Sequence, residues 1–513
     1  MVILAFEIIT IGHQSSLQGS LKETIMERME VLPSWNDDSS IIASYNSINS
    51  DEDSTSCVIN KMHPSDSSPT SGTGLTVGIR GLEDRSKVEL YKKRFIILFL
   101  FCLYSASNAF QWLQYTIITQ KISTFYKVDN LSVNLTSMLY MFVFVPGTIP
   151  ASWLLDRKGL RFTVLIGSFF TFVGALVKCA SVQPDRFWVT MIGQTIVATC
   201  NLFVINLPPR IAAVWFGERE VSTATSIGVF GNQLGICVGF FLPPLIVHSS
   251  NIDEISKQLA YVFYGTAVFT GLLFIAIVLF FEDKPKKSPS NSAARANFLQ
   301  EDLYFLQSLK ALITDLNMVK LTLSYGINVG IFYAISTILE QMISSAFPGH
   351  ESDAGNIGAI ITVVGTFGSM ISGFILDKTH RYKETILALY LFSFIGLIGF
   401  TVVLKFNILY VYIISAPLGF FMTGYLPIGF EYAAEITYPQ PEGNSASLLN
   451  ASAQFFGIIM IFGSTLLVDR LGHLICNIIL CAILFIGLIL TSLTNGELKR
   501  RQATLKSHEY MNS

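Results

Sequence analysis

Aromatic and amide side chains recur at helical spacing in the first long apolar segment of the chain. They are Tyr104, Asn108, Trp112 and Tyr115. Spacings of four, four and three residues place all of them on one face of a helix. Aromatic faces attract quaternary ammonium groups, and each face contributes about 0.5–2 kcal/mol. On these residues alone the favoured interpretation is an aromatic stripe that only packs, and a site for an organic cation is the alternative.

Ionisable side chains are scarce in the apolar segments and lie near their ends. They include Glu340, Glu431, Glu435 and Lys178. Proton-coupled transport normally needs such a group in the middle of a membrane helix, so the pattern favours facilitated, uncoupled movement of a solute. Sodium coupling through neutral oxygens stays open. For Glu340 there are two interpretations, a carboxylate that attracts cations or a solvated charge at a loop edge.

The composition is that of a membrane protein. Of the 513 residues, 51% are hydrophobic and only 14% are charged, whereas a soluble protein carries roughly 25% charged residues. The net charge of −2 argues against a nucleic-acid partner. The seven cysteines form no CxxC pair and no cluster with histidine. No nucleophile–base pair is apparent either, so we expect no metal site, no cofactor and no enzymatic activity.

Twelve apolar segments are long enough to cross a bilayer, which takes about 20 helical residues. They lie near residues 95–119, 133–155, 162–181, 188–213, 223–247, 259–281, 319–345, 355–376, 385–404, 408–430, 445–468 and 473–493. Residues 1–90 contain a stretch rich in Ser, Asp and Asn and are expected to form a disordered cytoplasmic tail. The predicted domains are two six-helix halves at 91–282 and 319–494. A cytoplasmic linker at 283–318 joins them, and 495–513 form a second cytoplasmic tail.

Basic residues and glycosylation sequons predict the same orientation. Asn130 and Asn134 begin sequons in the loop after the first helix, so one of them is expected to carry a glycan on the outer side. A further sequon at Asn450 lies within a predicted helix and is interpreted as chance. Lys and Arg mark the cytoplasmic side of a membrane. Twelve crossings place five basic clusters on one side with both termini: Lys92–Arg94, Arg157–Arg161, Lys284–Lys287, Lys378–Lys383 and Lys499–Arg501.

The two halves repeat one another at a fixed offset of 221 residues. This offset relates four pairs: Tyr104 and Tyr325, Trp112 and Tyr333, Asp156 and Asp377, and Gln233 and Gln454. Four matches at one offset indicate a duplicated six-helix unit. Because both copies start on the same side, they are parallel repeats, and a substrate is expected near the midplane between them.

The loop after the second predicted helix resembles the signature loop of the major facilitator superfamily. It reads Asp-Arg-Lys-Gly-Leu-Arg from Asp156 to Arg161. The glycine usual four residues before the Asp is Ser152 in this copy, but it is present as Gly373 in the second. The resemblance implies an all-α fold of twelve transmembrane helices in two pseudo-symmetric halves. It also implies a gating role for Asp156, Arg157, Gly159, Arg161, Gly373 and Asp377.

Further motifs resemble one family within that superfamily, the feline leukemia virus subgroup C receptor family. They are NAFQWLQY (108–115), RIAAVWFGEREVSTA (210–224), GNQLG (231–235), GFFMTGYLPIGFEYAAEITYP (419–439) and EGNSASLLNASAQ (442–454). The similarity runs from about Tyr91 to Arg501. It implies a carrier of choline and ethanolamine, and haem transport is also attributed to the family. We expect a monomeric, multi-pass protein of the plasma membrane, or alternatively of an organelle membrane.

The resemblance assigns candidate substrate-binding residues. The family's choline-binding positions fall on Trp112, Tyr333 and Gln454, and a further family Gln falls on Asn201, which is one methylene shorter. In this superfamily the first and seventh helices line the central cavity, so Tyr115 and Tyr325 are further candidates. As repeat mates, Trp112 and Tyr333 are expected to approach the cavity from opposite sides and to clamp a cation between them.

Two other functions compete with a choline or ethanolamine carrier. A haem carrier would use His, Cys, Met or Tyr as iron ligands, but all seven histidines lie in tails, loops or helix ends. A non-transporting surface receptor or sensor is the other alternative. Prolines within predicted helices, such as Pro146 and Pro427, argue instead for a carrier that moves, because helix breaks often mark hinges.

Overall fold

The computed structural model describes residues 91–217, 220–249, 251–285, 305–440, 442–494 and 498–502. Within these residues the structure is helical and has no strand. Twelve of the helical segments are long and apolar enough to cross a membrane, and each overlaps one of the twelve predicted segments. The expected all-α architecture is therefore confirmed. The predictions for residues 1–90 and for most of 495–513 lie outside the described residues.

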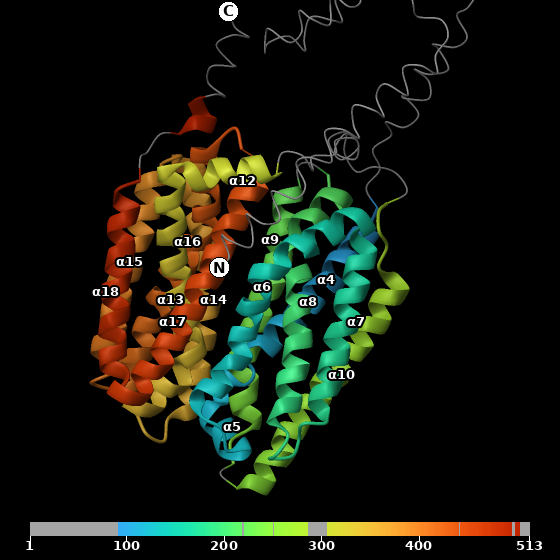
Figure 1. Cartoon of the computed structure of the whole chain (residues 1–513), viewed down its shortest axis with the longest axis vertical. Helices are drawn as coiled ribbons and strands as arrows, with labels where there is room; N and C mark the ends of the chain where they lie inside the picture. The colour runs from blue at the N-terminus through green and yellow to red at the C-terminus, as the bar shows by residue number, and fades with distance from the viewer. Residues whose placement is uncertain are drawn as a thin grey trace, which may run out of the picture. The chain divides into compact units, whose positions relative to one another are not determined.

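The first half contains six membrane-length segments, whose arrangement Figure 1 shows. They are α4 (Lys93–Leu113) with its extension η1 (Thr116–Ile118) and α5 (Thr119–Tyr126), α6 (Asn130–Lys158), α7 (Leu160–Cys179), α8 (Phe187–Trp215), α9 (Val221–Ile246) and α10 (Ile252–Phe280). We call the end of the bundle at which α4 begins the terminal end, and the opposite end the α5 end.

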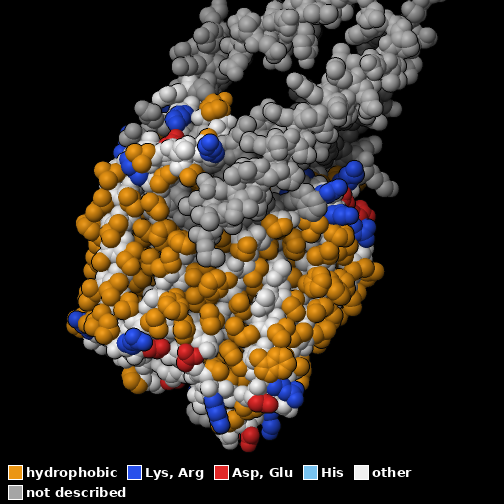
Figure 2. Space-filling model, viewed as in Figure 1, with side chains coloured by type: hydrophobic (Ala, Val, Ile, Leu, Met, Phe, Trp, Pro, Cys, Tyr) orange, Lys and Arg blue, Asp and Glu red, His pale blue; other side chains and the backbone are white. Residues whose placement is uncertain are grey.

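The second half also contains six, preceded by the short helix α12 (Phe305–Thr314) at the terminal end (Figure 1). They are α13 (Leu316–Ala346), α14 (Glu351–Thr379), α15 (Tyr382–Val403), α16 (Ile408–Thr437), α17 (Glu442–Leu471) and α18 (His473–Ser492). The halves meet where α9 packs on α14 and α6 packs on α17. Figure 2 shows a broad apolar surface between two ends where charged side chains gather, as lipid contact requires.

Several helices begin at a residue whose side chain accepts a backbone hydrogen bond. Asp129 accepts from the N–H of Ser132 at the start of α6, and Asp315 accepts from the N–H groups of Asn317 and Met318 in α13. These caps satisfy N–H groups that the first turn leaves without a partner. The sequence therefore fixes where these helices begin, and with them the depth of each side chain in the bundle.

The first helix differs from the prediction. A single helix over 95–119 was expected, but α4 ends at Leu113 and the chain continues through a turn into η1 and α5. The hydroxyl of Thr116 donates to the carbonyl of Leu113, and that of Thr119 donates to the carbonyl of Thr116. Hydroxyls that bond nearby carbonyls compete with helical hydrogen bonds. Tyr115 therefore lies beyond the end of the regular helix.

Glycines allow the closest helix pairs to approach within each half. In the first half, a Cβ at Gly231 on α9 would lie 2.7 Å from Cα of Cys102 on α4. In the second, a Cβ at Gly330 on α13 would lie 2.9 Å from the backbone of Phe456 on α17. Backbones at this distance exclude any side chain, and small residues are the usual means of close packing in membranes. These contacts hold α4 and α13 at the centre of their halves.

The internal repeat extends to an unusual backbone conformation. Gly159 follows α6 with φ of +83°, and His380 follows α14 with φ of +52°. These residues are also 221 positions apart, so both copies of the signature loop leave their helix through a positive φ. The N–H of Arg161 donates to Asp283 at 2.9 Å and fixes the first loop to the segment after α10. A duplicated unit thus retains the loop geometry even where glycine is replaced.

Candidate functional site

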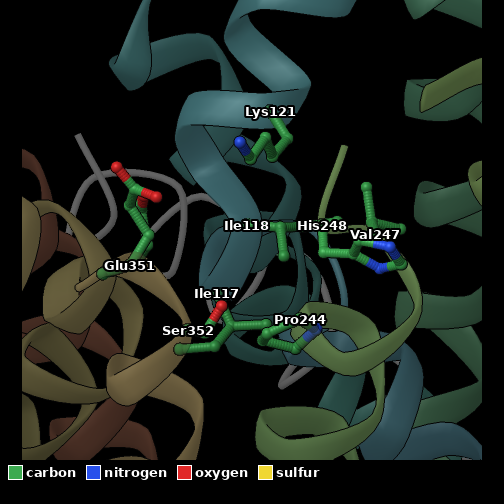
Figure 3. A pocket seen from close by; sticks show the side chains of 9 residues that line it. Ile117, Ile118, Lys121, Pro244, Val247, His248, Glu351 and Ser352 are labelled. Carbon is green, nitrogen blue, oxygen red and sulfur yellow. The ribbon is translucent and has the colours of Figure 1, made fainter. Parts of the chain in front are cut away.

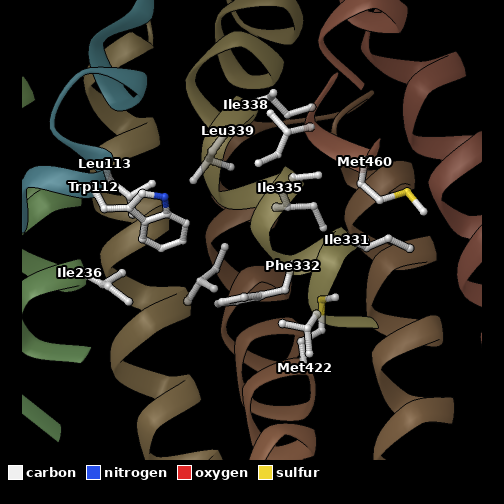
Figure 4. Close-up of a cluster of buried hydrophobic side chains, with 14 of the residues drawn as sticks. Trp112, Leu113, Ile236, Ile331, Phe332, Ile335, Ile338, Leu339, Met422 and Met460 are labelled. Carbon is white, nitrogen blue, oxygen red and sulfur yellow. The ribbon is translucent and has the colours of Figure 1, made fainter. Parts of the chain in front are cut away.

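Trp112 and Tyr333 meet between the two halves. Trp112 projects from the end of α4 towards α13 (Figure 4), and its ring centroid lies 5.5 Å from that of Tyr333 with an angle of 83° between the ring planes. The structure thus brings the two repeat mates together. The contact is edge-to-face, a preferred arrangement of aromatic pairs. It leaves no room for a cation between the rings, so the expected clamp is not formed in this conformation.

Gln454 and Gly457 on α17 complete the surroundings of Tyr333. The side chain of Gln454 forms a hydrogen bond with the Tyr333 hydroxyl. A Cβ at Gly457 would lie 3.1 Å from Cδ2 of Tyr333 and 2.7 Å from the sulfur of Met141 on α6. Gly457 therefore leaves the space that the Tyr333 ring and Met141 occupy. Reasoning from the sequence missed Gly457 and Met141, although Gly457 lies only three residues after Gln454.

Asn201 on α8 lies deeper towards the terminal end. Asn108 on α4 donates to the carbonyl of Val197 on α8 at 3.1 Å, which aligns the two antiparallel helices. Trp112 is four residues beyond Asn108 towards the α5 end, and Asn201 is four beyond Val197 in the opposite direction. At 1.5 Å per residue, their backbones differ in depth by about 12 Å. Because side chains lean towards the start of their helix, Trp112 and Asn201 lean towards each other.

Tyr115 and Tyr325 lie away from the Trp112–Tyr333 pair. Tyr115 is fully buried within the first half, 5.7 Å from the ring of Phe263 on α10. Tyr325 is buried within the second half, 5.7 Å from the ring of Tyr425 on α16. The same holds for Tyr104, whose hydroxyl donates to the carbonyl of Cys200. The aromatic stripe therefore divides, and Trp112 is the member that reaches the other half.

Lys178 is a charged group whose burial the sequence did not reveal. It lies on α7 with a relative exposure of 1%. Its Nζ donates to Oε1 of Gln111 at 3.0 Å and lies 5.6 Å from the ring centroid of Tyr115. Gln194 donates in turn to the carbonyl of Gln111. Lys178 thus packs inside the first half and is separated from the interface with the second.

Hydrogen bonds between polar side chains close the α5 end of the interface. Asn134 on α6 donates to Thr465 on α17 at 2.8 Å and accepts from Gln341 on α13 at 3.0 Å. Four further contacts join Gln341 to Thr119, Ser137 to Thr337, Gln120 to Ser344, and Asn130 to Asp469. We call this set of contacts the α5-end seal. It separates the Trp112–Tyr333 pair from the space beyond the α5 end.

Glu340 belongs to this closed region, and its interpretation as a solvated charge is wrong. Its relative exposure is 1%, because α13 faces the first half along this stretch. The expectation failed because hydropathy places the residue near a helix end but does not reveal that η1 and α5 cover it. Glu340 lines a small cavity together with Lys121, His248 and Glu351 (Figure 3).

The two predicted glycosylation residues have different surroundings. Asn134 is fully buried, and both atoms of its amide are hydrogen-bonded within the α5-end seal. Asn130 is half-buried at the first turn of α6, where its amide donates to Asp469 at 2.9 Å. A glycan needs an accessible amide, so in this conformation the geometry favours Asn130 over Asn134.

The predicted gating residues lie at the terminal end, where α6 and α14 finish. Arg157 and Arg161 are exposed there, and a Cβ at Gly159 would lie 2.8 Å from Asp283. Gly373 on α14 has no neighbour within 4 Å of a Cβ, so its surroundings do not require glycine. The side chains of Asp156 and Asp377 lie outside the described part of the structure, and their gating role stays a prediction.

The chemistry available at the interface is recognition by aromatic faces and amides. Among the described residues, no group of three or more His, Cys, Asp or Glu is arranged to hold a metal ion. Nε1 of Trp112 is buried and has no partner in the described part of the chain, so it is a donor available to a ligand. A groove of about 510 Å³ lies elsewhere, between α6 and α8, and is lined by apolar residues and Thr199.

Comparisons with known proteins agree with this architecture. The family model of the Major Facilitator Superfamily matches residues 98–460. The fold is similar to a bacterial homologue of the human lysosomal transporter Spinster in an inward-facing, occupied conformation. That likeness has a TM-score of 0.61 at 12% identity and covers 79% of this chain and 97% of that one. The nucleoside transporter NupG is similar to the same degree, with a TM-score of 0.59 over 77% of this chain and 98% of that one, at 12% identity.

Sequence relatives are much closer than these structures. The chain is 44% identical to choline/ethanolamine transporter flvcr2a of Danio rerio, over 82% of this chain and 90% of that protein. It is 41% identical to choline/ethanolamine transporter FLVCR2 of Homo sapiens, over 84% of this chain and 82% of that protein. An MFS-type transporter of Caenorhabditis elegans is 46% identical over 82% of this chain and 73% of that protein. The chain is thus a multi-pass membrane transporter that belongs to the major facilitator superfamily and, within it, to the feline leukemia virus subgroup C receptor family.

Proposed function

We propose that this transporter carries choline and ethanolamine across the membrane by alternating access, without coupling to an ion gradient. The observation that carries the proposal is the contact of Trp112 with Tyr333 at 5.5 Å across the interface of the two halves. Relatives that are 41–44% identical and named choline/ethanolamine transporters support the same substrates. The protein acts as a monomer in the plasma membrane, and it has no catalytic activity.

The two rings bind the cationic headgroup in the corner between their faces, and the headgroup does not lie between two parallel rings. Rings at 83° present two faces that meet nearly at a right angle. A quaternary ammonium in the corner lies within about 6 Å of both centroids, which is the range of cation–π attraction. Entry of the headgroup needs only a small separation of the two rings. We therefore place the cation against Trp112 and Tyr333 at the level of their contact.

The amide side chains hold the polar end of the substrate. Gln454 is bonded to the Tyr333 hydroxyl, and Asn201 leans towards Trp112 from the terminal side. An amide both donates and accepts hydrogen bonds, so it suits a hydroxyl as well as an amine. The shorter reach of Asn201 favours a contact through water. This arrangement orients the substrate with its cation towards the α5 end.

The α5 end is extracellular, and the structure's closed end faces outward. Basic clusters at the terminal end, such as Arg157–Arg161 and Lys499–Arg501, support this orientation. Release of the α5-end seal then opens the site to the outside. When the carrier opens outward, Asp156 and Asp377 lock the cytoplasmic side by pairing with neighbouring Arg residues or with a helix N-terminus. Asp156→Asn is expected to lower the turnover rate more than it weakens choline binding, and an unchanged rate at normal surface expression would exclude this role.

Uptake measurements test the proposed function directly. Cells that lack their own choline carriers would express the protein and receive labelled choline, ethanolamine or haem in separate assays. We expect saturable uptake of choline and ethanolamine that is insensitive to the sodium and proton gradients. A haem-dependent signal without choline or ethanolamine flux would overturn the proposal in favour of a haem carrier. The absence of flux for all three compounds would favour a receptor or sensor.

A further inference from the structure

One face of α13 forms a continuous path from the aromatic pair to the α5 end. Tyr333, Thr337, Glu340, Gln341 and Ser344 follow one another at spacings of three, four or one residues, as one helix face requires. Each of them contacts the first half. When the α5-end seal opens, this face must separate from the first half. It then becomes one wall of the entry path to Trp112 and Tyr333.

Glu340 is the only charged residue between positions 321 and 346 of the chain. It lies seven residues, or two helical turns, beyond Tyr333 on the same face, which is about 10 Å along the helix axis. A cation that moves down this wall passes the carboxylate before it reaches the aromatic pair. The charge thus stands at a defined depth on the path, between the outer space and the binding site.

The closed conformation leaves this carboxylate only partly satisfied. The backbone N–H of Gln120 donates to the carboxylate. Its Oε2 is buried and has no hydrogen-bond partner within the described residues. Beyond the bond from Gln120, the small cavity that Glu340 lines is where the carboxylate can meet a further partner, and burial of a carboxylate without one is costly. Its uncharged neighbours Thr337, Gln341 and Ser344 each form a hydrogen bond across the interface, although Oε1 of Gln341 also has no partner within the described residues.

The surroundings of Glu340 match a cation rather than an anion. The small cavity beside it is lined by the carboxylates of Glu340 and Glu351, by the amine of Lys121 and by the imidazole of His248 (Figure 3). Its volume of about 30 Å³ is roughly that of one water molecule. A choline headgroup therefore has no room here while the seal is closed, and the site exists for a substrate only when the α5 end opens.

We propose that Glu340 forms a second, outer binding site for the organic ammonium substrate, occupied while the α5 end is open. This inference rests on the proposed function and extends it to the entry path. The carboxylate raises the local concentration of the cation about 10 Å above the aromatic corner. When the seal closes, the substrate has moved inward, and the carboxylate turns to the backbone N–H of Gln120.

Choline uptake by Glu340→Gln tests the outer site, with 3,3-dimethyl-1-butanol as an uncharged analogue of choline. We expect the KM for choline to rise about fivefold, because one charge–charge contact near 4 Å in water is lost. The inhibition constant of the uncharged analogue should stay unchanged. Glu340→Asp should restore most of the choline affinity. Glu254→Gln is the matched control, since it removes an exposed carboxylate at the same end but outside α13.

The outcomes separate this inference from the proposed function. In Glu340→Gln, the KM for choline and the inhibition constant of the analogue could rise by the same factor. That result would mean that Glu340 only sets the balance between the open and closed states, and it would overturn the outer site. Unchanged choline kinetics in Glu340→Gln, with flux that still depends on Trp112, would overturn the outer site alone. No choline or ethanolamine flux in the wild-type protein would overturn both proposals.

Discussion

Removal of the Trp112 ring tests the aromatic corner most directly. Trp112 has a relative exposure of 8%, and Tyr333 provides the second face of the corner. In Trp112→Ala one of the two faces is lost. A cation–π contact at such a desolvated site contributes about 1–2 kcal/mol, so choline should bind about fivefold to thirtyfold more weakly. Trp112→Phe keeps a smaller aromatic face and should cost no more than about threefold.

Binding and transport of the Trp112 variants would be measured separately. Calorimetric titration of the purified protein with choline gives the affinity, and uptake at matched surface expression gives KM and the turnover rate. Thermal unfolding of each variant controls for damage to the surrounding apolar cluster (Figure 4). Choline affinity within twofold of the wild type in Trp112→Ala would refute the corner. Equal losses in Trp112→Ala and Trp112→Phe would assign the role to ring shape or to the indole N–H instead.

Three further substitutions probe the site and the orientation of the chain. Gly457→Ala places a Cβ 3.1 Å from the Tyr333 ring, so it should displace that ring and weaken choline uptake severalfold at normal surface levels; wild-type uptake would show that the ring tolerates the shift. Asn130→Gln should abolish a mass shift on deglycosylation, whereas Asn134→Gln should not, because Asn134 is buried; the reverse pattern would contradict the closed α5 end. Asn201→Gln restores a longer amide and should hold or raise uptake of choline and ethanolamine, and a clear loss would show that the shorter side chain is required.

The α5-end seal gives Asn134 an energetic role in the closed state. Both atoms of its side-chain amide are hydrogen-bonded when the α5 end is closed, so Asn134 favours that state. A carrier must also open, since a state that is too stable traps the substrate or excludes it. Substitution of Asn134 should therefore shift the transporter towards the open α5 end.

Much of the fold follows from patterns along the chain. Twelve apolar segments of about 20 residues predict twelve membrane helices, because a helix of that length spans the bilayer and satisfies its own backbone hydrogen bonds in lipid. The offset of 221 residues predicts the two-fold repeat, and it pairs Trp112 with Tyr333. This symmetry places the two residues at the same depth, one in each half, and the structure brings their rings into contact.

The sequence by itself thus determined the number of helices, their repeat and the central pair Trp112 and Tyr333. Only the tertiary structure decided that α4 ends before Tyr115, that Asn134 is buried and that Glu340 is covered by the first half. The physical reason is that a membrane helix is apolar both where it faces lipid and where it packs on another helix. Hydropathy therefore gives the depth of a side chain but not its partner, and the partner is set by which helix faces meet when the two halves close.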